Sequence, residues 1–480
     1  MPEKFIEVGN APLSEKPRQE LGKSAHAYVC DGKYIVLDVN SGGVHLTDKL
    51  CYDMIVCLSA SANTPGFALP VCCPDEFFSV FAEHSRSEII ECYDEIAELY
   101  NAGLLFSSLG YEQFAKESVG APLKALCLHV AHDCNLRCEY CFADTGGFGG
   151  ERNVMSSLTA QKAVDFLIEN SGEREILEID FFGGEPLMAW DTVRTTVEYA
   201  RSLEKKCGKR FNFTLTTNGL LLDDEKSEFI NREMSNIVLS LDGRKQINDL
   251  MRKTKNRASS YDIILPKYKR LVEGRTKPGR TDYFIRGTFT KHNLDFCEDV
   301  LAIAREGFTE ISLEPAVVNE NLPFSLTRQD IPRIKDEYER LYSIMKEPNC
   351  GFRFFHFDID LNQGPCAIKR LRGCGCANEY VAVTPNGDIY PCHQFVGIER
   401  WKMGCVHNKP AFSNHNIKEY FCETHVYTKK ECQNCWAKFY CSGGCNAVSY
   451  IHCGDVRASH EISCELMKKR IEYAISLNIR

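Results

Sequence analysis

The sequence has no hydrophobic run long enough to cross a bilayer, and its first ten residues, MPEKFIEVGN, contain no apolar segment preceded by basic residues. A transmembrane helix and a secretory signal each require such a segment. We therefore expect a cytoplasmic protein that does not act at a membrane. Its 480 residues, of which 44% are hydrophobic, are enough for two or three domains with cores of their own.

Basic residues are scarce in the first part of the chain. Residues 1–110 contain 16 Asp or Glu and only 7 Lys or Arg, whereas the remainder balances at 50 of each sign, so this part carries the whole formal charge of −9. Because an acidic surface repels the phosphate backbone, we expect no nucleic-acid partner and a preference for basic ones.

Cysteine, in contrast, is abundant, with 25 residues. The odd number argues against complete disulfide pairing within the chain, and disulfide scaffolds are usually short secreted proteins. In a reducing compartment, clustered cysteines are more typical of metal binding. Isolated cysteines such as Cys92, Cys127, Cys207 and Cys297 are interpreted as small buried hydrophobic residues.

The acidic segment, residues 1–110, predicts a small winged-helix-like domain. Strand-like runs flank the hairpin signal Asp31-Gly32, and a helix is predicted over 87–101 because apolar residues recur there at helical spacing. Such a module suits a peptide that adds alongside an exposed strand. A purely structural N-terminal cap is the alternative interpretation.

Beyond a linker at 111–124, residues 125–346 alternate six strand-like runs with helix-length segments. This pattern predicts an α/β fold in which a parallel sheet curls into a partial (β/α)6 barrel, with reactive groups at the carboxyl ends of the strands. A bridging region, 347–372, leads to residues 373–480, which are rich in Cys, Gly and aromatic residues. We expect bound metal to organise this last segment.

Three cysteines follow the first strand of the predicted barrel, in the run HDCNLRCEYCFADTGGFGG. Cys134, Cys138 and Cys141 are separated by three residues and then by two, so one loop can present three thiolates to a [4Fe–4S] cluster and leave the fourth iron without a protein ligand. The competing interpretations are a zinc loop and three unrelated buried thiols. The spacing, followed by an aromatic residue, resembles the cluster loop of radical S-adenosylmethionine (SAM) enzymes, in which the open iron holds SAM.

A glycine pair follows the second strand, in Gly183-Gly184-Glu185-Pro186. Glycines let a backbone approach a ligand closely, and a carboxylate accepts from an ammonium group, although GGEP is also an ordinary turn. Its position after the cysteine loop resembles the radical SAM motif that binds the methionine amino group.

Two later segments resemble further SAM contacts of this family. Ser240 and Asp242, in SLDG, correspond to a hydroxyl and a carboxylate near SAM, and Arg252, in NDLMRK, corresponds to an arginine that meets its carboxylate. Roles in a solvated loop are the alternative for all three. No general base is identified, and Asp180 is only a speculative nearby carboxylate with a packing or capping role as its alternative.

The second cysteine constellation resembles the SPASM domain, the C-terminal extension of radical SAM enzymes that mature peptides and proteins. The resemblance implies two auxiliary [4Fe–4S] clusters, and its seven ligands leave an eighth position open to Cys366, to Cys376 or to a substrate thiolate. Zinc bound by four cysteines competes for the run 432–445 taken alone. The implied ligands are Cys432, Cys435, Cys441 and Cys464 for one cluster, and Cys374, Cys392 and Cys445 for the other.

Over nearly its whole length the sequence most closely resembles the SCIFF maturases, which act on six-cysteine peptides. The resemblance implies SAM, three [4Fe–4S] clusters, a small electron donor such as flavodoxin or ferredoxin, and a Cys-rich precursor peptide whose leader binds the N-terminal module. The implied reaction installs Cys thioether crosslinks after hydrogen abstraction by a 5′-deoxyadenosyl radical. The alternatives are side-chain oxidation, as in anaerobic sulfatase maturases, carbon–carbon crosslinking, and a zinc-rich interaction protein.

Overall fold

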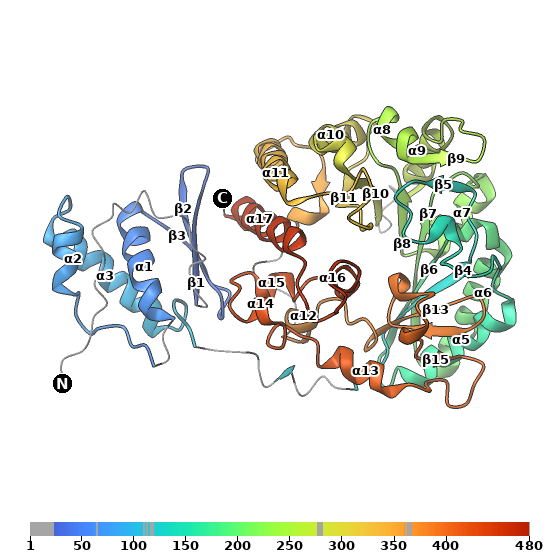
Figure 1. Cartoon of the computed structure of the whole chain (residues 1–480), viewed down its shortest axis with the longest axis horizontal. Helices are drawn as coiled ribbons and strands as arrows, with labels where there is room; N and C mark the ends of the chain where they lie inside the picture. Colours follow the sequence, from blue (N-terminus) through green and yellow to red (C-terminus); the bar gives the residue numbers. More distant parts are fainter. Residues whose placement is uncertain are drawn as a thin grey trace. The chain divides into compact units, whose positions relative to one another are not determined.

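The computed structural model describes residues 24–63, 66–108, 111, 114–115, 120–275, 282–359, 361 and 367–479, and Cys366 lies outside this part of the chain (Figure 1). The chain forms two compact units. One comprises residues 1–110 with 433–439, and the other comprises residues 111–432 with 440–480.

The first unit contains a three-stranded antiparallel sheet followed by helices. Its strands β1 (Ala25–Cys30), β2 (Lys33–Asp38) and β3 (Val44–Thr47) pair in that order. The turn at Asp31 and Gly32 uses positive φ angles of 52° and 73°, as the hairpin signal predicts. The helices are α1 (Lys49–Ala62), α2 (Asp75–Val80) and α3 (Arg86–Asn101).

Helix α3 matches the helix predicted at 87–101, and it begins at a capping box formed by Ser85 and Glu88. Its Ile89, Tyr93 and Ile96 are buried in the core of the unit. One expectation fails here. Cys92 is not an isolated hydrophobic residue but forms a disulfide with Cys51 of α1, since the packing of α1 on α3 brings the two residues together.

The second unit is built on a ten-stranded sheet in the order β12-β11-β10-β8-β7-β6-β4-β13-β14-β15. All six predicted strands are present and pair in parallel, which confirms the predicted α/β fold. They are β4 (Ala125–Ala131), β6 (Ile176–Gly183), β7 (Arg210–Thr217), β8 (Asn236–Ser240), β10 (Tyr283–Phe289) and β11 (Glu310–Pro315).

Alternation along these strands separates an apolar face from a more polar one. In β7, Phe211, Phe213 and Leu215 are fully buried, whereas Thr214 and Thr216 between them face a cavity. Helices connect the strands: α5 (Ser157–Asn170), α6 (Trp190–Cys207), α7 (Asp224–Glu233), α8 (Lys245–Met251), α9 (Tyr261–Arg275), α10 (Phe296–Arg305) and α11 (Ile331–Met345).

The Cys-rich segment has more regular structure than its sequence indicates. Its strand β13 (Tyr380–Val383) pairs in parallel with β4 and continues into an antiparallel hairpin with β14 (Asp388–Tyr390) and β15 (Gly404–Cys405). At the other sheet edge, β12 (Arg353–Phe354) pairs with β11. The segment thus shares the sheet of the barrel, because an unpaired strand edge offers it backbone hydrogen bonds.

Six helices complete the C-terminal part, and the long α17 packs against α11. None of the helices in the described ranges is both long and apolar enough to cross a membrane. The six helices are α12 (Ala367–Arg372), α13 (His415–Cys422), α14 (Lys430–Gln433), α15 (Lys438–Cys441), α16 (Asn446–Cys453) and α17 (Glu461–Asn478).

Candidate functional site

A cavity of about 760 Å³ lies on the concave side of the partial barrel, toward the carboxyl ends of its strands. This volume is within the usual range for a small-molecule site. Its walls come from the barrel strands, from the loop after β4 and from the Cys-rich segment. The cavity therefore joins regions that are far apart in the sequence.

The cysteine loop forms one wall of this cavity, with Cys134, Cys138 and Cys141 all lining it. Part of the loop is the short strand β5 (Leu136–Cys138), which pairs antiparallel with β9 (Arg252–Thr254). In this register Cys138 lies opposite Arg252. The predicted SAM-contacting arginine is thus attached to the predicted cluster loop by backbone pairing.

The Cys134 sulfur is surrounded by donors. Its Sγ lies 3.4 Å from the Leu136 amide nitrogen and 3.5 Å from Nδ2 of Asn218, the residue that follows β7. Burial raises the pKa of the Cys134 thiol to about 11 and that of Cys138 to about 12. Such thiols lose their protons when they bind metal, and the N–H groups then stabilise the thiolate.

The glycine pair supports the loop directly. A Cβ on Gly183 would lie 2.3 Å from the Ala131 carbonyl oxygen, and one on Gly184 would lie 2.1 Å from that of Asp133. The amides of Gly184 and Glu185 donate to these same carbonyls, at 2.8 and 2.9 Å. The absence of a side chain at both glycines therefore lets this backbone pack against the cysteine loop. The sequence analysis had instead predicted that the glycines make room for a ligand.

Glu185 lines the cavity, but most of its acceptor capacity is used by the protein. Oε1 accepts from the Leu187 amide at 3.0 Å and from the Thr217 hydroxyl at 2.7 Å, and Oε2 accepts from the Asn218 amide at 2.8 Å. A carboxylate offers about four lone-pair positions. One position on Oε2 is left for a donor such as an ammonium group, as the predicted role requires.

Arg252 faces the cavity in a fixed position. It is 6% exposed, its Nη1 donates to the Tyr140 hydroxyl at 3.0 Å, and its Nε has no partner in the described structure. Asp242 lies behind it and accepts from the same hydroxyl at 2.7 Å and from the Thr288 amide at 3.0 Å. Asp242 therefore does not line the cavity but acts on it through Tyr140.

Sequence reasoning missed Tyr140, although it stands directly before Cys141 in the motif. Burial raises the pKa of Asp242 to about 6, against the opposing effects of Arg252 and Tyr140. Two other residues that the sequence singled out in the barrel, the candidate SAM contact Ser240 and the carboxylate Asp180, do line the cavity. Burial also raises the pKa of Asp180 to about 6, because its surroundings disfavour the charged form.

Four thiols of the Cys-rich segment influence one another electrostatically. Cys374, Cys392 and Cys445, the three implied ligands of one auxiliary cluster, are joined by Cys376. A hydrogen bond between the thiols of Cys374 and Cys376 lowers the pKa of Cys374 and raises that of Cys376. Nδ2 of Asn446 lies 3.5 Å from the Cys376 sulfur.

The other four implied ligands are Cys432, Cys435, Cys441 and Cys464. Cys441 and Cys464 line the cavity, as does Cys445, and the buried Cys432 has its sulfur 3.8 Å from the Ser459 hydroxyl. Cys435 belongs to the segment that groups with the N-terminal unit, and it is half-buried.

A buried lysine that the sequence did not single out accompanies these thiols. Lys429 is 1% exposed and donates to the Gly443 carbonyl at 2.9 Å. Burial lowers its pKa, while Cys432, Cys441 and Cys445 raise it. Its charge offsets the negative charge of nearby thiolates. Its place three residues before the first cysteine of the 432–445 run is the only sequence signal for it.

The lining of the cavity also includes a carboxylate that the sequence did not single out. Glu314, at the end of β11, lies 3.3 Å from Nη1 of Arg470, a buried residue of α17 whose Nη2 has no partner among the described residues. Arg286 of β10 lies 3.9 Å from the same carboxylate and is half-exposed. Both arginines line the cavity, so their remaining N–H groups can hold an anionic or carbonyl group beside Glu314.

These residues fit a [4Fe–4S] cluster and SAM. Three thiols stand on one short loop, which matches a cluster with one open iron. The unpartnered Nε of Arg252 suits the carboxylate of SAM, and the free position on Glu185 suits its amino group. The donor set and the spare hydrogen-bonding capacity agree with each other.

Comparisons with known proteins agree with this description. The Radical SAM superfamily model matches residues 128–284. The cysteine-type anaerobic sulfatase-maturating enzyme of Clostridium perfringens (strain 13 / Type A) is 26% identical over 380 residues, which cover 74% of this chain and 96% of the relative. The radical SAM cyclopropyl synthase TigE of Paramaledivibacter caminithermalis is 22% identical over 430 residues, 83% of this chain and 85% of the relative.

A solved structure described as native anSMEcpe with bound AdoMet and Kp18Cys peptide has a TM-score of 0.60 and 20% identity, and the match covers 74% of this chain and 98% of that one. This similarity shows a shared fold. The chain therefore carries a radical SAM domain, which implies SAM and a [4Fe–4S] cluster, and it is homologous to anaerobic sulfatase-maturating enzymes.

Proposed function

We propose that this radical SAM enzyme installs Cys thioether crosslinks in a ribosomally made, Cys-rich precursor peptide. One observation carries the proposal: a single cavity is lined both by Cys134, Cys138 and Cys141 and by the thiols of Cys441, Cys445 and Cys464. A peptide in this cavity would lie between the site of radical formation and the auxiliary clusters. The relatives named above, a sulfatase-maturating enzyme and a structure with a bound peptide, support a peptide or protein substrate.

Each implied group has candidate residues in this chain. Cys134, Cys138 and Cys141 would hold the radical SAM cluster, and Glu185, Ser240 and Arg252 would orient SAM, with Tyr140 and Asp242 fixing the arginine. When bound, SAM and its cluster supply a radical that removes hydrogen from a carbon of the substrate. The protein orients the peptide and excludes water, and the largely buried cavity walls suit this task.

The auxiliary clusters would be held by the seven cysteines that the SPASM resemblance implies. We propose Cys376 as the eighth ligand, since it lies among Cys374, Cys392 and Cys445. With that position filled, a peptide thiol would reach the cluster only by replacing Cys376. A small electron donor such as flavodoxin or ferredoxin completes the proposed system.

The N-terminal unit would bind the leader of the precursor. Its edge strand β3 is the least buried strand of the small sheet, and Leu46 on it is 55% exposed. An extended peptide can add to such an edge through backbone hydrogen bonds. The excess of acidic residues in this part of the chain favours a basic leader.

The second candidate function is oxidation of a side chain without crosslinking. The homology to sulfatase-maturating enzymes over 74% of this chain favours it. The decisive experiment is co-expression with a Cys-rich small reading frame adjacent to the gene, followed by mass spectrometry of the reduced peptide. A thioether removes two hydrogens and one alkylatable thiol, a carbon–carbon link removes two hydrogens and no thiol, and oxidation of one residue leaves no crosslink.

The colour of the purified protein distinguishes a zinc-rich interaction protein from the iron–sulfur enzymes considered above. Protein purified without oxygen should be brown and contain about twelve irons if three cubane clusters are filled. A colourless protein containing zinc and no iron would exclude the enzymatic proposal.

A further inference from the structure

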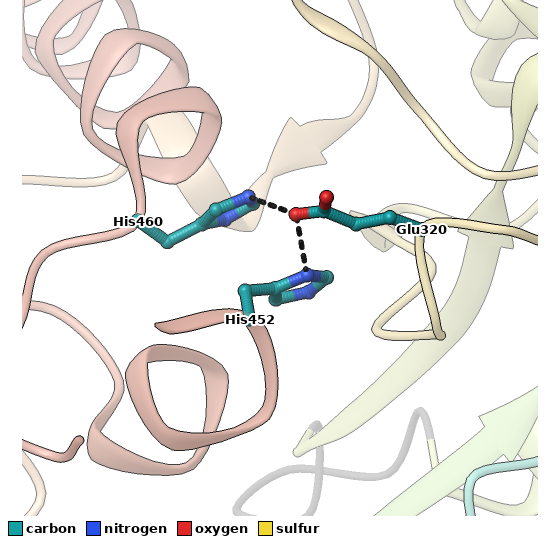
Figure 2. A group of neighbouring side chains, drawn as sticks. All are labelled: Glu320, His452 and His460. Carbon is teal, nitrogen blue, oxygen red and sulfur yellow. Dashed lines mark ion pairs between the residues drawn. The ribbon is translucent and has the colours of Figure 1, made fainter. Parts of the chain in front are cut away.

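Three side chains of metal-ligand type meet at a point outside both cysteine constellations (Figure 2). Glu320 lies in the segment after β11, His452 lies near the end of α16, and His460 directly precedes α17. One ligand atom of each residue lies within 4.8 Å of the other two. Three separate segments of the second unit thus converge on one place.

Both imidazoles direct a nitrogen toward the same carboxylate oxygen. Nδ1 of His452 is 3.3 Å from Oε1 of Glu320, and Nε2 of His460 is 4.0 Å from it. Ligand atoms around a tetrahedral zinc ion, at bond lengths of about 2.0–2.1 Å, lie about 3.3 Å apart. Because the two rings are stacked with their planes 8° apart, their in-plane lone pairs run side by side, so at least one imidazole must turn for all three atoms to surround one ion.

The second nitrogen of His460 is also held. Its Nδ1 lies 2.9 Å from the Ser463 hydroxyl. When that hydroxyl accepts from Nδ1–H, Nε2 carries the free lone pair, and this nitrogen lies 4.0 Å from Oε1 of Glu320. A hydrogen bond of this kind on the far side of the ring is typical of metal-ligating histidines, because it fixes the tautomer and the ring orientation.

The imidazole rings of His452 and His460 are stacked. Their centroids are 4.1 Å apart, and their planes differ by 8°. An ion pair between Glu320 and one protonated imidazole would explain why that ring lies beside the carboxylate. It would not explain the second ring, since two protonated rings in contact would repel each other. The histidine side chains are 9% and 14% exposed, whereas that of Glu320 is 62% exposed, so an ion could enter from the side of the carboxylate.

We propose that Glu320, His452 and His460 bind a divalent transition-metal ion, with Zn²⁺ as the best match. Two imidazoles and a carboxylate are a known zinc ligand set, with water in the fourth position. The ion ties the segment after β11 to α16 and α17. Because His460 and Ser463 also line the large cavity, and α17 carries Cys464, the ion would stabilise one rim of the substrate site.

The test uses the full-length holoenzyme, purified without oxygen, incubated with excess Zn²⁺ and then desalted. We expect about one retained zinc per chain, with nitrogen and oxygen neighbours at about 2.0 Å in zinc-edge X-ray absorption. Zinc with sulfur neighbours at about 2.3 Å would belong to cysteines and would overturn the proposal. Failure to retain any zinc would overturn it as well.

Three variants locate the ion. Glu320→Gln changes an exposed side chain, so folding and iron content should be preserved while the affinity for Zn²⁺ falls more than about tenfold. His460→Ala should lose the zinc with nitrogen and oxygen neighbours, and His415→Ala, at an exposed position of α13, should retain it. Equal zinc binding in Glu320→Gln and the unmodified enzyme, or equal loss in His415→Ala, would refute the site. If His460→Ala does not fold, Glu320→Gln decides.

Discussion

Cys138 and Arg252 lie opposite each other in the two-stranded β5–β9 ladder, although they are far apart in the sequence. A proposed cluster ligand and a proposed SAM contact are thus held in one register. Backbone hydrogen bonds set this distance, and the Tyr140 hydroxyl holds the guanidinium at 3.0 Å. The position of SAM relative to its cluster would therefore depend on this ladder.

Arg252→Lys should weaken SAM binding and leave the cluster in place. Lys cannot hold a carboxylate in two places, and a lost hydrogen bond to a charged group costs about 1.5–3 kcal/mol, or roughly ten- to a hundredfold in affinity. Equilibrium dialysis with SAM and an iron assay would measure both quantities. The neighbouring half-exposed residue offers a control, since Lys253→Ala should change neither the SAM affinity nor the iron content. Unchanged SAM affinity in Arg252→Lys would remove the arginine from the site.

Gly184→Ala should abolish assembly of the radical SAM cluster. The added methyl would lie 2.1 Å from the backbone oxygen of Asp133, so the cysteine loop would have to move. We expect a loss of about four irons per chain together with SAM cleavage. Gly150→Ala is the control, because its nearest neighbour would be 3.7 Å away. Full iron content in Gly184→Ala would show that the loop tolerates the shift.

Cys376→Ala tests the eighth ligand of the auxiliary clusters. If Cys376 completes the set of Cys374, Cys392 and Cys445, the iron content should fall from about twelve to about eight. Cys350→Ala, which replaces a half-buried cysteine outside these groups, should keep about twelve. An unchanged content in Cys376→Ala would assign the position to Cys366 or to a thiolate of the substrate.

Asp180→Asn tests whether this carboxyl takes part in proton transfer. Its pKa is raised to about 6 by burial, so a reaction that needs the ionised form should accelerate as the pH rises through about 6 and then level off. The variant should be slower, and its rate should not change in this range. Single-turnover measurements between pH 5 and 8 provide the comparison. Matching profiles in both proteins would leave Asp180 with a packing role.

Ionisation of the Asp180 carboxyl should lower the stability of the folded protein, although it would promote proton transfer. Its pKa in the folded protein lies above the ordinary value of 3.8, so the folded state binds the proton more tightly than the unfolded state does. The resulting stabilisation is complete below about pH 4 and is lost as the pH rises through about 6. Relative to Asp180→Asn, the melting temperature of the unmodified protein should therefore fall over this interval.

Leu46→Asp tests the proposed leader site. It places a charge on the edge strand β3, where an added peptide strand would pack, and we expect at least about tenfold weaker binding of a labelled leader by fluorescence anisotropy. Val71→Asp adds the same charge at a side chain that is 99% exposed outside the sheet, and it should bind normally. Equal affinities of the two variants for the leader would exclude β3 as its binding site.

Much of the barrel could be predicted from the sequence. The six strands are short apolar runs with helix-length spacing, and parallel pairing follows from that alternation. The positions of β4, β6, β7, β8, β10 and β11 therefore depend on local patterns. The cysteine loop is local too, because Cys134, Cys138 and Cys141 lie within one short segment whose spacing suits a cluster. The glycine pair was recognised in the same way, although its contact with Asp133 was not.

Contacts between distant segments could not be predicted. Nothing local places Arg252 opposite Cys138, buries Lys429 near the later thiols, or pairs β13 with β4, since each depends on how the chain packs in three dimensions. The same is true of the Glu320, His452 and His460 group, which has no motif. The sequence by itself determined which chemical groups are present and which short loops carry them. The tertiary structure decided which of those groups share a cavity, because only packing sets distances between segments.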